Sequence, residues 1–202
     1  PVCIASVYPS KHTNQYYNSI HPIMSEMFKG IGIKNGVLAI QFFVEDDNFY
    51  AYDPGFRLQG EAMHIYINAI NDFDHRLMLI NFALTGSMGV EDLSERNDFL
   101  LCGKHACTLW VLLKSGVIKD INGLKELQQD PSVVFVMQRF FEGDIVLRHM
   151  VGNERQVLAR IYIVSETKED LVLKIHAIES ALSVIDEDGN DMIVDLFNAS
   201  FL

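Results

Sequence analysis

The second half of the chain alternates between short apolar runs and polar turns, and this spacing restricts it to a sheet-rich fold. The apolar runs cover residues 108–113, 117–121, 133–140, 145–150 and 156–164. Turn segments such as "KSG", "QQDPS" and "VGNE" separate them. Runs of this length between turn residues predict short β-strands. A helix is predicted to follow, because Thr167 and Asp170 resemble a capping box and apolar residues recur at helical spacing, namely Leu171, Ile175, Ile178 and Leu182.

The first half mixes helical and hairpin patterns. A short strand is predicted over residues 2–7 and a helix over residues 15–28, which Pro22 would start or kink. Residues 37–44 and 49–52 flank the polar turn "EDDN" and predict a β-hairpin. A second helix, capped by Asp72 or Asp74, should end at Gly86. Its expected inner face consists of Leu77, Ile80, Ala83 and Leu84.

These patterns predict an α+β chain of two parts. The polar, glycine-containing segment "GSMGVEDLSERND" is the expected boundary, which gives domains at residues 1–92 and 93–202. The first domain combines the hairpin with helices. The second is rich in β-strands and is closed by one long helix.

Composition excludes several classes of protein. The formal net charge is -11 with only 16 Lys and Arg, whereas a nucleic-acid or anionic-membrane surface needs a basic patch. No apolar run approaches the roughly 20 residues of a membrane-spanning helix. Three cysteines form no disulfide framework, so we expect a reducing, cytoplasmic setting. The chain opens "PVCIASVYPS", which reads as the interior of a fold and leads us to expect a fragment of a longer protein.

Two polar clusters invite a metal-binding interpretation and fail it. In "DEDGND" an EF-hand loop starting at Asp186 would need Gly at its sixth position, but Gly189 is the fourth. Cys102, His105 and Cys107 have no second ligand pair at zinc-site spacing. We therefore predict a polar hairpin turn for the first cluster and structural roles for the second.

The hairpin carries the most informative polar residues. Gln41 interrupts an apolar strand, and a buried polar group without a hydrogen bond is costly. Asp53 ends the returning strand. A three-residue loop (residues 46–48) would place Gln41 directly opposite Asp53, whereas a two- or four-residue loop would pair Gln41 with Tyr52 and turn Asp53 to the other face.

If Gln41 and Asp53 share a face, their oxygens and nucleotide phosphates would suit Mg²⁺, which keeps few protein ligands. Arg57 could then neutralise a phosphoryl group. A plain hairpin with a polar end explains the same residues equally well.

The stretch resembles the metal-binding hairpin of the ATP-grasp superfamily. In that family a strand with Glu or Gln is followed about a dozen positions later by a motif such as E-x-N-x-R. Gln41 takes the first position, Asp53 that of the Glu, Gly55 that of the Asn and Arg57 that of the Arg, and Gly60 matches a following glycine. Downstream, "GD", "E-T-x-x-x-L" and "V-x-D-x-x-G" resemble the C-terminal part of biotin-carboxylase-like enzymes, and the carbamoyl-phosphate synthase large chain also has Gln at the first position.

The resemblance implies a C-terminal portion of an ATP-dependent carboxylate–amine ligase acting through an acyl phosphate. Gln41 and Asp53 would hold Mg²⁺ or Mn²⁺, Arg57 would steady the phosphoryl group, Phe43 would pack under the adenine, and Lys11 would face the phosphates. The implied partners are a small carboxylate substrate, the missing N-terminal lobes and a second copy in a homodimer, with no nucleic acid and no membrane.

Two departures from the family pattern keep other readings open. Asp53 is shorter than Glu, and Gly55 provides no ligand where Asn is usual. Because the lobe that carries the other half of an ATP-grasp site is not in this sequence, the chain is expected to be a ligase fragment that is inactive alone. The alternatives are a degenerate remnant serving as a binding or assembly module, and an unrelated α+β domain whose hairpin mimics the motif.

Overall fold

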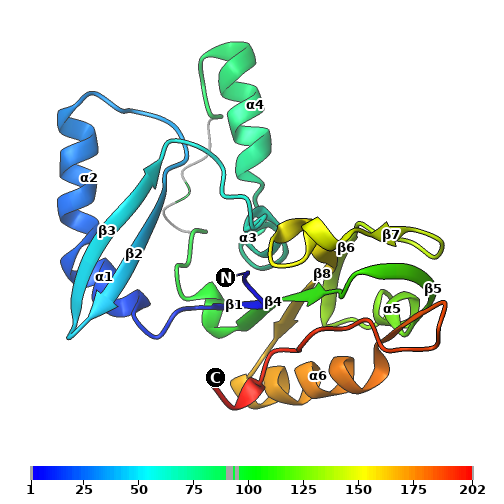
Figure 1. Cartoon of the computed structure of the whole chain (residues 1–202). Helices are drawn as coiled ribbons and strands as arrows, with labels where there is room; N and C mark the ends of the chain where they lie inside the picture. Colours follow the sequence, from blue (N-terminus) through cyan, green and yellow to red (C-terminus); the bar gives the residue numbers. More distant parts are fainter. Residues whose placement is uncertain (1, 90–92, 94–95, 202) are drawn as a thin grey trace. The chain divides into compact units, whose positions relative to one another are not determined.

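The computed structural model describes residues 2–89, 93 and 96–201 of the 202-residue chain (Figure 1). They form two compact units. Unit 1 comprises Pro1–Tyr8 together with Gly103–Leu202, and unit 2 comprises Pro9–Cys102. The chain therefore leaves unit 1 after its first strand, builds unit 2, and returns to unit 1.

This division differs from a boundary placed between residues 92 and 93. Residue 92 lies outside the described residues, and the compact units divide later, at Gly103. The first strand also belongs with the second half of the chain, because β1 (Ala5–Tyr8) pairs antiparallel with β4 (His105–Leu112). Sequence patterns read locally cannot reveal a pairing between strands so far apart.

Unit 2 combines helices with one hairpin. Its described elements are α1 (Thr13–Ser19), α2 (His21–Gly30), β2 (Ala39–Glu45), β3 (Asn48–Gly55), α3 (His64–Asn71) and α4 (His75–Thr85). The helix predicted over residues 15–28 is divided into α1 and α2. Pro22 lies in the first turn of α2, where its missing N–H removes no helical hydrogen bond. The patterns gave no expectation of α3.

The predicted ends of α4 are confirmed. The Asp74 carboxylate accepts a hydrogen bond of 2.8 Å from the Arg76 backbone N–H, and hydrogen bonds from Arg76 hold the pKa of Asp74 at about 2. Gly86 ends the helix with φ 76°, a left-handed conformation that glycine adopts without strain.

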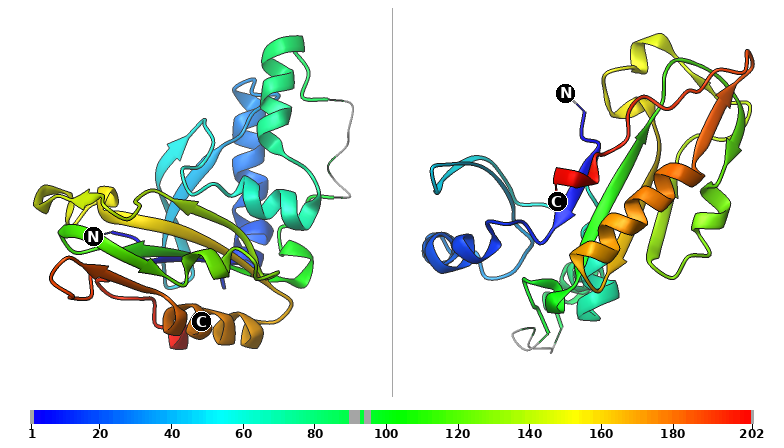
Figure 2. Two further views of the ribbon diagram at one scale, coloured as in Figure 1. Left: turned by 90° about the vertical axis from the view of Figure 1, so that its right-hand side faces the viewer. Right: turned by 90° about the horizontal axis from the view of Figure 1, so that it is seen from below.

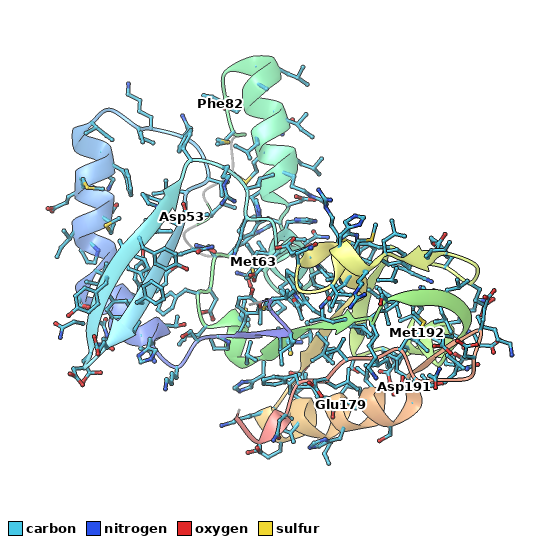
Figure 3. All side chains as sticks on the ribbon, viewed as in Figure 1. Asp53, Met63, Phe82, Glu179, Asp191 and Met192 are labelled. Atoms are coloured by element: carbon cyan, nitrogen blue, oxygen red, sulfur yellow. The ribbon has the colours of Figure 1, made fainter. Side chains whose placement is uncertain are left out.

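The predicted inner face of α4 is wrong. Leu77, Ile80 and Leu84 are 60%, 53% and 79% exposed, and α4 buries no residue. Helical periodicity indicates that one face of the helix is apolar, but it does not indicate whether another element of the same chain packs against that face. Figure 3 marks Phe82 on this helix, and it too is exposed.

Exposure extends to the rest of unit 2. Neither α1 nor α2 buries a residue, and α2 with the residue that follows it carries an exposed apolar stripe of Ile23, Met27 and Ile31. The buried apolar residues of the described part of unit 2 are Ala62, Tyr66 and Leu101. The described part of unit 2 therefore has very little hydrophobic core of its own.

Unit 1 is sheet-rich and well packed. Besides β1 and β4, its described elements are β5 (Gly116–Asn122), α5 (Leu124–Leu127), β6 (Val133–Gln138), β7 (Ile145–Val146), β8 (Val157–Ser165), α6 (Lys168–Ala181) and β9 (Ser183–Asp186). Short 3-10 helices lie at Arg148–Met150, Glu154–Gln156 and Ala199–Phe201, and another, Leu101–Gly103, spans the point where the chain passes from unit 2 to unit 1. One antiparallel sheet has the order β1-β4-β8-β6, and a second has the order β7-β5-β9.

The core of unit 1 lies between the four-stranded sheet and α6, as Figure 2 shows. Leu171, Ile175 and Ile178 of α6 are fully or almost fully buried, as predicted, and the Thr167 hydroxyl caps the helix by accepting from the Asp170 N–H. On the other face of the sheet, the Arg160 guanidinium lies 3.9 Å from the centre of the Trp110 ring.

The two sequence clusters that invited a metal-binding interpretation belong to ordinary turns and strands. Asp186 accepts from the N–H groups of Asp188 and Asn190, which closes the predicted polar turn after β9. Cys107 is buried in β4, and burial raises the pKa of its thiol to about 12.

The helices and antiparallel sheets described above confirm the predicted α+β fold class. None of the described helices has the length and apolar character to cross a bilayer.

One ion pair ties α6 to the turn before β6 and makes unit 1 sensitive to acid. The Asp130 carboxylate accepts from Lys174 Nζ at 2.6 Å and from the Ser132 hydroxyl at 2.6 Å, which lower the pKa of Asp130 to about 2. A carboxylate with a lowered pKa stabilises the folded state above its unfolded pKa of about 3.9, and this contribution is lost as pH falls toward 2.

We therefore expect Asp130→Asn to lower the free energy of unfolding by about 1 kcal/mol at pH 6. The difference from the parent should shrink between about pH 4 and pH 2. Urea unfolding followed by fluorescence of Trp110, the single tryptophan, measures it. Asp188→Asn in the exposed turn is the control and should leave stability unchanged; a pH-independent deficit in Asp130→Asn would contradict the ion-pair explanation.

Candidate functional site

The β2–β3 hairpin turns through two residues. Glu45 pairs with Asn48, and Asp46 and Asp47 have φ of 46° and 62°, the positive values that a tight hairpin turn requires. The three-residue loop considered in the sequence is therefore not formed. A two-residue loop alone would set Gln41 opposite Tyr52.

Gln41 nevertheless lies opposite Asp53, because β3 contains a bulge. Phe42 pairs with Ala51, whereas Gln41 pairs with Asp53, so Tyr52 is an extra residue on β3. A bulge of this kind places two residues against one on the partner strand. The pairing proposed from the sequence is present, although a bulge and not the loop produces it.

The two faces of β2 have different surroundings. Gln41, Phe43 and Glu45 are exposed, while the alternate residues are partly buried. On the second face, Phe42 and Phe49 pack against Tyr16 of α1, with ring centroids 5.6 and 6.1 Å away. The first face is the open one, and it carries Gln41.

The open face holds a connected set of side chains. The Tyr52 hydroxyl donates to Gln41 Oε1 at 2.5 Å. The Tyr52 ring is stacked on Phe43, with centroids 4.4 Å apart and planes inclined by 23°. Phe43 therefore shares the face of Gln41, and it remains 64% exposed.

Asp53 and Arg57 form a loose, exposed pair at the end of β3, where Figure 3 labels Asp53. Arg57 Nη2 lies 3.9 Å from Asp53 Oδ2, and both side chains are about half exposed. A Cβ added at Gly55 would lie 3.1 Å from Arg57 Nε, so a side chain at position 55 would begin beside Arg57. A contact of this length in water leaves the guanidinium able to bind another anion.

The donors fit one kind of metal ion. Gln41 and Asp53 offer oxygen atoms from directly paired residues, and no group of three or more His, Cys, Asp or Glu side chains in the described residues could hold a metal by itself. Two protein oxygens are too few for a calcium or zinc cage. They suit Mg²⁺, which completes its shell with water and substrate phosphates.

Lys11 is not brought to this set by any contact. It is exposed in the turn before α1, and its neighbour His12 packs edge-on against Phe49, on the opposite face of the hairpin from Gln41. Its phosphate-facing role remains a prediction.

Tyr52 is the site residue that sequence reasoning did not select. In "FYAYD" it looks like one more strand aromatic. Its contact with Gln41 depends on the bulge, and no pattern in the sequence marks that bulge.

Solved structures share this fold, whereas neither a scan against protein-family models nor a search of curated proteins found a match. Phosphoribosylglycinamide synthetase from Anaerococcus prevotii matches 92% of this chain, with TM-score 0.75 and 15% identity, over 46% of its own length. L-amino acid ligase from Bacillus licheniformis matches 91%, with TM-score 0.74 and 17% identity, over 46% of its length.

A third match comes from a biotin carboxylase domain. This domain of the Hydrogenobacter thermophilus 2-oxoglutarate carboxylase, solved with MgADP, ADP and bicarbonate, matches 94% of the chain with TM-score 0.64 and 13% identity. The chain spans 39% of that structure, and less than half of each of the three. The resemblance drawn from the sequence is thus confirmed for the fold: the chain has the fold of part of an ATP-grasp protein.

Proposed function

We propose that the chain is a C-terminal portion of an ATP-dependent ligase that activates a carboxylate as an acyl phosphate. The observation that carries the proposal is the pairing of Gln41 with Asp53 on the open face of the hairpin, with Arg57 beside Asp53. Similarity to a phosphoribosylglycinamide synthetase and an L-amino acid ligase supports a carboxylate–amine ligase, with a small carboxylate as substrate.

In this proposal Gln41 Oε1 and the Asp53 carboxylate hold Mg²⁺, or Mn²⁺ in its place. The bound ion would neutralise charge on the nucleotide phosphates. The aromatic pair of Phe43 and Tyr52 offers a flat, exposed platform on which the adenine would stack.

Arg57 contributes positive charge where the phosphoryl group is transferred. Its guanidinium carries five N–H donors and binds phosphate in a forked geometry. Because it is only loosely paired with Asp53, it can donate to an acyl phosphate at little cost. Charge neutralisation and alignment are then the chain's main contributions to catalysis.

A complete site needs a cover over its open face, and none of the described residues of unit 2 supplies one. The face of Gln41, the stripe of α2 and the apolar face of α4 are all exposed within unit 2. We propose that further lobes of the same protein cover them, and that the chain is inactive alone. The three free cysteines and the charge of -11 favour a cytoplasmic setting without nucleic acid; a homodimer remains a proposal.

A degenerate remnant with a binding or assembly role is the second candidate. Gly55, which supplies no ligand, and the short Asp53 favour it. ADP release by the full-length gene product, assayed with a panel of amino acids and hydroxy acids, separates the two. Turnover lost in Asp53→Asn and Arg57→Ala supports the ligase, and no turnover with any substrate supports the remnant.

The metal site can be tested on the chain itself by nucleotide binding. We expect Asp53→Asn to weaken binding of Mn²⁺–ADP at least tenfold, because a neutral amide replaces the charged one of the two proposed side-chain ligands. Electron paramagnetic resonance of free Mn²⁺ measures the affinity. The matched control is Asp47→Asn, which removes an exposed carboxylate from the turn of the same hairpin and should bind like the parent. Equal loss in both variants would indicate a general charge effect and no site.

A gain of affinity is expected when the absent ligand is restored. In Gly55→Asn the new side chain begins beside Arg57, whose exposed, flexible end can move aside. Its amide oxygen would reach the side of Asp53 and supply a third ligand. We expect Mn²⁺–ADP binding to tighten about threefold or more, with Gly55→Ala as the control for the added Cβ. Tightening in Gly55→Ala alone would contradict the proposed geometry.

The uncovered faces should be detectable by dye binding. We expect the parent chain to bind the fluorescent dye ANS, and Leu77→Lys with Leu84→Lys to reduce the signal without loss of stability, since both side chains are exposed. Leu173→Lys is the control, an exposed leucine on α6 of unit 1. An unchanged signal in the double variant would show that this face is already covered.

A further inference from the structure

Tyr52 occupies an unusual place in the hairpin. It is the extra residue of the β3 bulge, so two side chains of β3 face the single residue Gln41. Asp53 is one of the two and Tyr52 is the other. The bulge therefore gives Gln41 a charged neighbour and a hydroxyl neighbour at once.

Two contacts hold the Tyr52 side chain although it is 52% exposed. Its ring lies flat against Phe43, and its hydroxyl donates to Gln41 Oε1. The stacking fixes the plane of the ring, and the ring in turn fixes where the hydroxyl lies. An exposed glutamine side chain would otherwise sample several rotamers, each of which must be given up when it binds a ligand.

The hydrogen bond also determines which end of the amide is presented. A carboxamide has one acceptor oxygen with two lone pairs and one nitrogen that only donates. A hydroxyl donor selects the oxygen, uses one lone pair and leaves the other for a cation. Metal ligands are commonly held by such outer hydrogen bonds.

We propose that Tyr52 is a positioning residue that orients the Gln41 amide so that Oε1 is ready to bind the metal ion. This inference rests on the proposed function, because it assumes that Gln41 is a ligand. It assigns the role to the hydroxyl and leaves the ring to the stack with Phe43.

Tyr50 provides a matched comparison. It lies opposite Phe43 on the same hairpin and is 53% exposed, close to the value for Tyr52. Within the described residues the structure gives its hydroxyl no hydrogen bond. Tyr50→Phe and Tyr52→Phe each remove one exposed hydroxyl from the hairpin surface. Only Tyr52→Phe removes a hydrogen bond to Gln41.

The first measurement is Mn²⁺–ADP binding to the chain by electron paramagnetic resonance. We expect Tyr52→Phe to weaken binding about tenfold, the lower end of the range for residues that orient a metal ligand. Tyr50→Phe should bind within about twofold of the parent, a limit set by the spread of repeated affinity measurements on the parent. Circular dichroism should be the same for all three proteins, because the stack with Phe43 is kept.

The second measurement needs no metal. The side-chain ¹⁵N resonance of Gln41, assigned through Gln41→Glu, reports how rigidly the amide is held. We expect an ordered amide in the parent and in Tyr50→Phe, and a mobile one in Tyr52→Phe.

The outcomes separate this inference from the proposed function. If Asp53→Asn abolishes binding while Tyr52→Phe binds like the parent, the metal site stands and the role of Tyr52 is overturned. Tighter binding in Tyr52→Phe would overturn it too, since the hydroxyl would then compete with the metal. If the parent binds Mn²⁺–ADP no better than Asp53→Asn, the proposed metal site fails and the inference falls with it.

Discussion

The bulge in β3 is the feature on which the candidate site depends. Without the extra residue, the two-residue turn would set Gln41 opposite Tyr52 and direct the Asp53 carboxylate to the packed side of the hairpin. With it, an amide, a carboxylate and a phenol share one open face. Strand registers are usually fixed by turn geometry and burial, and here one inserted residue alters the register only at the polar end. The aromatic end, where Phe42 and Phe49 pack on α1, keeps the register of the turn.

The two units differ in what holds them together. Unit 1 buries a continuous cluster between its sheet and α6, and its ion pair between Asp130 and Lys174 secures the helix. Unit 2 buries few apolar residues and exposes stripes on α2 and α4. A unit with so little core gains little free energy from the hydrophobic effect alone. The chemistry proposed for the chain therefore lies on its less self-sufficient unit, where binding of a lobe and a nucleotide would add the missing contacts.

Much of the fold follows from local sequence, and the reasons for the rest are physical. The α6 cap at Thr167, the α4 ends at Asp74 and Gly86, and the hairpin around Asp46 are set by residues a few positions apart. The pairing of β1 with β4 cannot be predicted in this way, because the two strands are distant in the chain. The exposed face of α4 was wrongly predicted to be buried. The spacing of its apolar residues is the same whether or not another element packs against them. In the site, the spacing of Gln41 and Asp53 predicted that the two residues could pair. The bulge and the contact of Tyr52 depend on backbone geometry that could not be predicted from the local pattern of residue types.

The insertion of unit 2 between β1 and β4 has a consequence for how the protein is made. During synthesis β1 emerges before β4 and cannot pair with it until the whole of unit 2 has followed, since Ala5 pairs with Leu109. Closing so long a loop slows the pairing of β1 with β4. Loss of β1 would thus remove one outer strand from a four-stranded sheet whose other three strands all follow unit 2 in the sequence.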